Sequence, residues 1–193
     1  KQLALQTDWG ALDYLIIDLP PGTGDVALTM SQLLPLTGAV VVCTPQRVAQ
    51  DDARRAVRRA DDDRAPQRVA QDDARRAVRM FQQLGIPIMG VVENMSFFID
   101  SAGVKHEIFG RGGGARVAEY SKAPLLGQVP MESIVREWGD NGTPVVQAAP
   151  NSESSKAFRD IAERLADRVT VELFDQHGGI APIEGPRRLP ILR

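Results

Sequence analysis

The sequence predicts an α/β domain with a doubly wound, mostly parallel sheet. Two observations support this prediction. Short apolar runs that suit buried strands alternate with helical stretches along the chain. One of these runs ends in an acid followed by a Pro-Pro-Gly-Thr-Gly turn, a pattern typical of the ligand-binding edge of open α/β sheets.

Four strands are expected, over residues 14–18, 39–43, 86–93 and 125–129. A helix is expected over 25–34, with Asp25 as its N-cap and Pro35 ending it. Two further helices are expected over 115–120 and 152–169. The second carries an apolar stripe at helical spacing, made by Phe158, Ile161, Ala162, Leu165 and Val169.

A repeated segment interrupts this order. Residues 45–58 recur without a change at 66–79. The second copy continues a helical stripe, whereas the first runs into the charged residues 59–64. Repeat folds need three or more repeats to bury a continuous core. We therefore expect one helix of the fold and an inserted, solvated excursion, produced by duplication or by an error in the sequence rather than by a functional repeat.

Composition limits the classes of function. The 193 residues are 43% hydrophobic and carry a formal net charge of -2, as expected for one domain with a real core and without nucleic acid as its main partner. No stretch reaches the ~20 apolar residues of a membrane span. No signal segment opens the chain, so we expect a cytoplasmic protein. Cys43 is the single cysteine, which excludes an internal disulfide and a Cys-x-x-Cys pair.

Asp18 is the first candidate site residue. It closes the apolar run 14–18, and a buried carboxylate is costly unless its charge is needed. The glycine turn that follows exposes backbone N–H groups. This combination favours a Mg²⁺–nucleotide site of the Walker B type. The alternatives are a helix N-cap or a salt-bridged loop acid.

Several motifs, taken in order, resemble the Mrp/ApbC family. They are Asp-Leu-Pro-Pro-Gly-Thr-Gly-Asp at 18–25, Pro-Leu-Thr-Gly-Ala-Val at 35–40, Thr-Pro-Gln at 44–46, Val-Glu-Asn-Met-Ser at 92–96, Ile-Phe-Gly-x-Gly-Gly-Gly at 108–114, Leu-Leu-Gly-Gln-Val-Pro-Met at 125–131 and Asp-Asn-Gly-Thr-Pro-Val at 140–145. This family comprises MinD-like P-loop ATPases that act as iron–sulfur cluster carriers. The resemblance covers about residues 10–168. It implies an ATP site at the carboxyl edge of a parallel sheet and a homodimer around that site. The implied partners are iron–sulfur scaffold and apo-client proteins.

The resemblance also implies roles for single residues. Asp18 matches the acid that supports Mg²⁺, generally through a water, and Gly22 and Gly24 match the switch turn that follows the γ-phosphate. Asn94 matches the asparagine whose amide reads the adenine edge, and an amide does offer the paired donor and acceptor that a purine edge requires. The alternative for Asn94 is a turn residue that caps the strand. Pro130 and Met131 match the loop that covers the base.

The phosphate loop of the family has no counterpart here. The 193 residues contain no Gly-Lys-Gly-Gly-Val-Gly-Lys-Ser/Thr stretch. We therefore expect residues 1–169 to be the carboxyl-terminal part of a P-loop ATPase domain, and not to hydrolyse ATP alone. Residues 170–193 are expected to form a flexible tail. The glycine-rich turn 110–114 lacks the following Lys and Ser/Thr, so we expect it to lie against the site or a dimer partner rather than to hold phosphate.

The cluster ligands of the family are also absent. Family carriers place Cys-Pro-x-Cys after the Asn-Met-Ser segment, where this chain has Asp100 and Gly103. These residues are poor ligands for a [4Fe–4S] cluster, and Cys43 lies in an apolar run typical of a core. Asp100, His106 and Glu107 could be drawn as a metal site, but a surface loop is the favoured interpretation.

Three functions remain open. The leading one is an ATP-binding assembly factor for iron–sulfur clusters. A non-catalytic, MinD-like dimerising or client-binding scaffold is the alternative, favoured by the missing cysteine pair. A MinD/ParA-type positioning ATPase ranks last, because residues 170–193 show neither an amphipathic membrane-binding stripe nor a large basic cluster.

Overall fold

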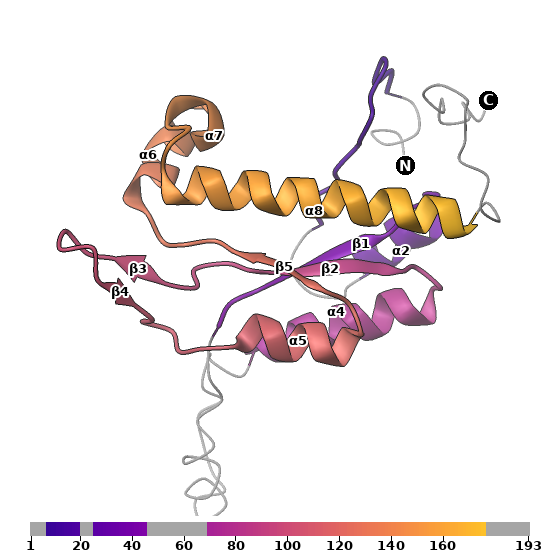
Figure 1. Ribbon diagram of the computed structural model, residues 1–193. Coiled ribbons are helices and arrows are strands. Elements are labelled where there is room, and N and C mark those ends of the chain that lie inside the picture. Colours follow the sequence, from indigo (N-terminus) through magenta and orange to yellow (C-terminus); the bar gives the residue numbers. More distant parts are fainter. Residues whose placement is uncertain (1–6, 20–24, 46–68, 177–193) are drawn as a thin grey trace, which may run out of the picture.

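The computed structural model describes residues 7–19, 25–45 and 69–176 as a three-layer α/β arrangement (Figure 1). The central layer is a three-stranded parallel sheet in the order β1-β2-β5. Its strands are β1 (Ala39–Cys43), β2 (Ile88–Glu93) and β5 (Leu125–Gln128). These match three of the four predicted strands. β2 begins two residues later than expected, because Pro87 has no N–H and the Ile86 N–H bonds to Phe81 O at 2.9 Å.

Helices cover both faces of the sheet. Figure 1 shows α4 (Val69–Gln83) and α5 (Gly113–Ser121) below the sheet and α8 (Glu153–Gln176) above it. The helix α2 (Asp25–Leu33) precedes β1 and confirms the helix expected over 25–34. Two short helices, α6 (Ser133–Asp140) and α7 (Val145–Ala148), link β5 to α8. Neither was predicted.

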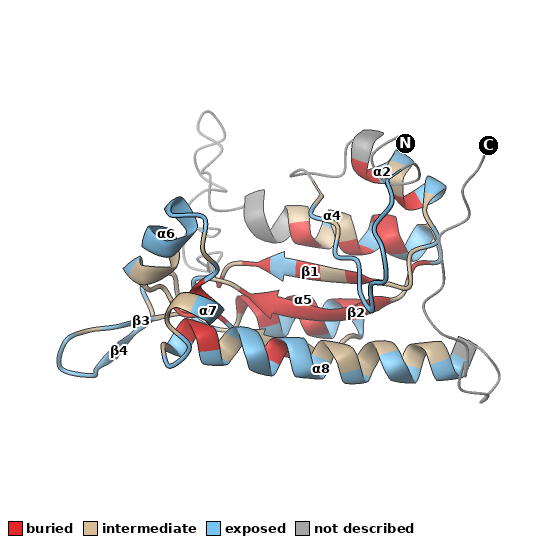
Figure 2. Ribbon diagram, turned by 90° about the horizontal axis from the view of Figure 1, so that it is seen from above, coloured by how far each residue is buried: buried red, intermediate tan, exposed pale blue. Residues whose placement is uncertain are grey.

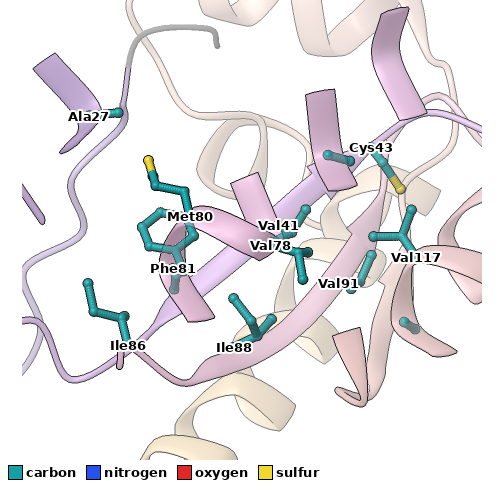
Figure 3. Packing of buried hydrophobic residues seen from close by; sticks show 13 residues of the cluster. Ala27, Val41, Cys43, Val78, Met80, Phe81, Ile86, Ile88, Val91 and Val117 are labelled. Carbon is teal, nitrogen blue, oxygen red and sulfur yellow. The ribbon is translucent and has the colours of Figure 1, made fainter. Parts of the chain in front are cut away.

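Two hydrophobic clusters lie on opposite faces of the sheet, because successive strand residues point to opposite sides. The larger cluster packs α2, α4 and α5 against one face, and its buried members include Val41, Val78 and Val91 (Figure 3). The smaller cluster packs α8 against the other face through Val92, Leu126, Val129 and Ile161. All six residues of β2 are buried, as expected for the central strand of a parallel sheet.

The strand predicted over residues 14–18 is wrong. Residues 14–18 form no strand in the structure, and Ile16 is 84% exposed. A strand needs a neighbour to satisfy its backbone N–H and C=O groups. Among the described residues, no strand pairs with this segment, and Tyr14, Leu15 and Ile16 are exposed, as the colours of Figure 2 show for this part of the chain.

The predicted end of the last helix at residue 169 is also wrong. α8 continues to Gln176, so residues 170–176 are helical rather than part of a tail. Arg168 and Glu172 form an ion pair one turn apart at 3.9 Å across the expected boundary. The predicted stripe is only partly used, since Ile161 is buried but Phe158 is 39% exposed.

The repeat is only partly described. The second copy supplies α4, whose Ala74, Val78 and Phe81 are buried in the larger cluster as the apolar pattern predicts. Most of the first copy and the charged excursion, residues 46–68, lie outside the described residues. So do residues 177–193 of the predicted tail.

Candidate functional site

The carboxyl ends of the three strands meet at one edge of the sheet. Cys43 of β1 pairs in register with Glu93 of β2, which pairs with Gln128 of β5. Two backbone bonds continue this pairing past the strands, from Asn94 N–H to Cys43 O and from Val129 N–H to Glu93 O, each at 2.8 Å. The segments that carry Asn94 and Pro130 are therefore held side by side at the edge where ligands bind in such sheets.

The side chain of Asn94 is half-buried, and one of its polar atoms already forms a hydrogen bond within the protein. Its Oδ1 accepts the backbone N–H of Met95 at 2.9 Å, and Met95 has a positive φ of 56°. This is the local turn bond of the alternative interpretation. It uses the amide's acceptor, so that the Nδ2 donors are the part of this side chain suited to a purine nitrogen.

Pro130 and Met131 are tied to the segment that follows Asn94. The Met131 N–H bonds to Phe97 O at 2.7 Å, and Met131 bridges to Phe98. Pro130 is buried and Met131 is half-buried. The loop after β5 and the segment after β2 therefore form one hydrogen-bonded unit beside Asn94.

The predicted magnesium acid lies elsewhere. Asp18 is exposed, and its neighbours Ile17 and Leu19 line an apolar cavity together with residues 38–40 at the start of β1. Asn94, in contrast, bonds to Cys43 at the end of β1. The structure does not bring the two candidates together at one strand end. The Mg²⁺ role of Asp18 stays a prediction, and Gly22 and Gly24 lie outside the described residues.

The glycine-rich turn 110–114 packs against the site, one of the two placements expected for it. Its last glycines begin α5, and a Cβ at Gly113 would lie 2.7 Å from backbone atoms of Thr44 and Pro45. The Gly114 N–H donates to the carboxylate of Glu93 at 2.5 Å. A side chain of this protein thus already occupies the amino end of the helix, where a phosphate would bind in a phosphate loop.

The segment that replaces the family's cysteine pair is a closed hairpin. Strands β3 (Phe98–Ile99) and β4 (Lys105–His106) pair antiparallel. Asp100 accepts the N–H groups of Ala102 and Val104, each at 2.9 Å. Its other oxygen lies 2.7 Å from His106 Nε2. The hydrogen bond from His106, followed by that from Val104, lowers the pKa of Asp100 below its usual range.

These contacts argue against a metal centre at the hairpin. Glu107 pairs with Arg111 one turn along the chain instead of joining Asp100 and His106. Within the described ranges, no three His, Cys, Asp or Glu side chains are grouped as metal ligands. The residues at 100 and 103 therefore do not fit an iron–sulfur cluster, and the surface-hairpin interpretation accounts for His106.

Cys43 is a core residue, as predicted. It is 4% exposed in the larger cluster. Burial, with a smaller contribution from the negative charge of Glu93, raises the pKa of the Cys43 thiol to about 12. The thiol is therefore protonated and unreactive at neutral pH.

This pKa predicts an alkaline loss of stability. A folded-state pKa of about 12 against 9.0 in the unfolded chain favours folding below pH 9, and this contribution disappears as the pH rises from 9 to 12. Urea unfolding at pH 7 and pH 10.5 should therefore show a larger loss for the natural chain than for Cys43→Ala. An equal loss in both chains would contradict the assignment.

Two residues of this edge escaped prediction from sequence. Glu93 and Gln128 hydrogen-bond across the ends of β2 and β5, with Gln128 Nε2 2.6 Å from Glu93 Oε1. The available signal was the charge of Glu93 itself, since it closes a strand whose other residues are apolar or glycine. Together with Asn94, these side chains define a polar edge on a parallel α/β sheet.

The fold and sequence place the chain among the P-loop NTPases. A family model described as ParA, NUBPL iron-transfer P-loop NTPase, matches residues 1–63 and 64–166, and the break falls between the two copies of the repeated segment. A nucleotide-binding protein from Archaeoglobus fulgidus, solved in complex with ADP, is 32% identical. It superposes with a TM-score of 0.52 over 69% of this chain and 47% of the other.

Curated relatives agree with this assignment. The chain is 43% identical over 89% of its length to the iron-sulfur cluster carrier protein of Synechocystis, and 41% identical over 95% to that of Escherichia coli K12. It is 38% identical over 88% to the mouse iron-sulfur cluster transfer protein NUBPL. The chain belongs to this NUBPL-type, iron-transfer P-loop NTPase family. It spans about half the length of these relatives, from 43% to 47%.

No helix within the described ranges is both long and apolar enough to span a bilayer.

Proposed function

We propose that this chain contributes the base-binding side of an ATP site in an iron–sulfur cluster assembly factor. The observation that carries the proposal is the junction at the carboxyl edge of the sheet. There Asn94 and the Pro130–Met131 loop are held by backbone bonds to neighbouring strands. The membership of the family and the nucleotide-bound relative support the choice of ligand.

In this proposal Asn94 donates an Nδ2 hydrogen to an acceptor nitrogen on the adenine edge, and Pro130 and Met131 cover the base. Asp18 would support Mg²⁺ through a water, and Gly22 and Gly24 would follow the γ-phosphate. Mg²⁺ would neutralise phosphate charge during hydrolysis. The exposed position of Asp18 means that residues 14–19 must move to the sheet before that role is filled. The proposed active form is a homodimer that serves iron–sulfur scaffold and client proteins.

Nucleotide binding tests this proposal directly. The 193-residue chain is titrated with a fluorescent ADP analogue in the presence of Mg²⁺, and the same titration is made for Asn94→Ala and the control Asn151→Ala. One lost hydrogen bond of about 1 kcal/mol predicts roughly fivefold weaker binding for Asn94→Ala. Asn151 is exposed, so its variant should bind like the natural chain. Equal affinity of all three would contradict the role of Asn94.

Sequencing the encoding gene through and beyond this segment separates the proposal from a scaffold function. A phosphate loop in frame before Lys1 would support an ATPase, whose turnover should be lost in Asp18→Ala. Its absence would favour the non-catalytic scaffold.

One observation on the hairpin already favours the scaffold. The hairpin carries no thiolate pair. Phe98 and Val104 in the hairpin and Ile108 just after it are 41%, 51% and 61% exposed, which suits contact with a protein.

A further inference from the structure

Glu93 is a carboxylate in a place where burial is costly. It is 1% exposed and ends a strand that is otherwise apolar or glycine. In the described part of the chain no cation forms an ion pair with it. An isolated carboxylate is strongly disfavoured in the protein interior, so the contacts of Glu93 must compensate for its loss of hydration.

Both oxygens of Glu93 are bound by donors from different elements. Oε2 accepts the Gly114 N–H in the first turn of α5 at 2.5 Å, and Oε1 accepts Gln128 Nε2 at the end of β5 at 2.6 Å. The positive end of the helix dipole adds to the first of these bonds. The carboxylate thus ties a helix and two strands together at one point.

The backbone of Glu93 extends this junction into the proposed base-binding segments. Its carbonyl accepts the Val129 N–H and the Ser96 hydroxyl, each at 2.8 Å. Asn94 follows Glu93 directly, and Pro130 follows Val129. A shift of Glu93 would therefore move both segments that are proposed to hold the base.

The close packing of α5 against the sheet also depends on Glu93. A Cβ at Gly114 would lie 2.7 Å from Glu93 Cβ, so the helix is seated directly on this side chain. The adjacent Gly113 touches Thr44 and Pro45 after β1. Through α5, the carboxylate also fixes the segment that leaves β1.

An apolar side chain of similar size would fill the same space without a desolvation cost. A carboxylate brings two acceptors, whereas a glutamine brings one acceptor and places an NH₂ against a donor. We propose that Glu93 is a positioning residue, whose buried carboxylate locks α5 and β5 onto β2 and so fixes Asn94 and the Pro130–Met131 loop for the adenine base. Its effect on nucleotide affinity rests on the proposed function, whereas the local locking does not.

Amide hydrogen exchange of the 193-residue chain tests the locking. Glu93→Gln should speed exchange at Gly114, Asn94 and Val129 at least tenfold, while amides of α8 near Leu165 keep their rates. A matched control is Glu119→Gln, because Glu119 lies exposed on the same helix α5. It should leave all of these rates unchanged. Faster exchange in every element alike would indicate a purely structural role and would overturn the proposal, as would unchanged exchange.

A second variant and a second measurement complete the test. Gln128→Ala removes one of the two hydrogen bonds to the Glu93 carboxylate. Gln128 itself is an exposed residue. If Glu93→Gln does not fold, this variant should still speed exchange at Val129 and Asn94 about threefold or more; no change there would overturn the proposal. Glu93→Gln should also bind the fluorescent ADP analogue about tenfold more weakly. If the natural chain binds no analogue, the proposed function fails for this chain, and the exchange rates alone decide the role of Glu93.

Discussion

Replacing Gly113 with alanine is expected to remove about 3 kcal/mol from the free energy of unfolding, at the upper end of the usual cost of overpacking. The added Cβ would lie 2.7 Å from Pro45 Cα and from Thr44 O. Both are backbone atoms that follow a buried strand, so they have little room to move. Urea unfolding followed by circular dichroism measures the loss.

A glycine elsewhere on the surface supplies the control. Gly139 in α6 has nothing within 4 Å of an added Cβ, so Gly139→Ala should stabilise the chain by about 0.5–1 kcal/mol through a lower entropy of the unfolded state. Equal unfolding midpoints for Gly113→Ala and the natural chain would show that α5 does not rest on the segment after β1.

Leu126→Ala is expected to cost about 3 kcal/mol, because removing a buried leucine side chain leaves a cavity. Leu126 is 2% exposed on β5 and belongs to the cluster that joins the sheet to α8. The same unfolding measurement applies. Leu33→Ala is the matched control, since Leu33 is 43% exposed at the end of α2 and should change stability by less than about 1 kcal/mol. Equal losses in the two variants would contradict the packing of α8 against the sheet.

The strands that were predicted correctly are those whose apolar pattern is joined by a neighbouring strand in the sheet. Residues 39–43, 86–93 and 125–129 are short apolar runs between helical stretches, and each finds a parallel neighbour in the sheet. Residues 14–18 carry the same apolar pattern. They form no strand because pairing depends on a neighbour, which a local pattern does not specify.

The placement of three candidate site residues at one edge of the sheet followed from the sequence for a similar reason, whereas their role in binding a base stays a prediction. Asn94, Pro130 and Met131 lie together because they follow neighbouring parallel strands, which the order of elements already indicated. Glu93 was missed because its role depends on donors 21 and 35 residues away, at Gly114 and Gln128. The hairpin was missed because its strands are only two residues each, too short to show a period.

The closure of this hairpin by Asp100 has an evolutionary consequence. Three donors, the backbone N–H groups of Ala102 and Val104 and the ring of His106, bind this one carboxylate. A loop closed by metal ligands depends on its ion to stay folded. This hairpin is instead closed by hydrogen bonds among its own residues. Substitutions along its exposed edge that leave Asp100, His106 and the local backbone in place should therefore preserve the closure of the hairpin, so that the surface of this hairpin can change while its fold is kept.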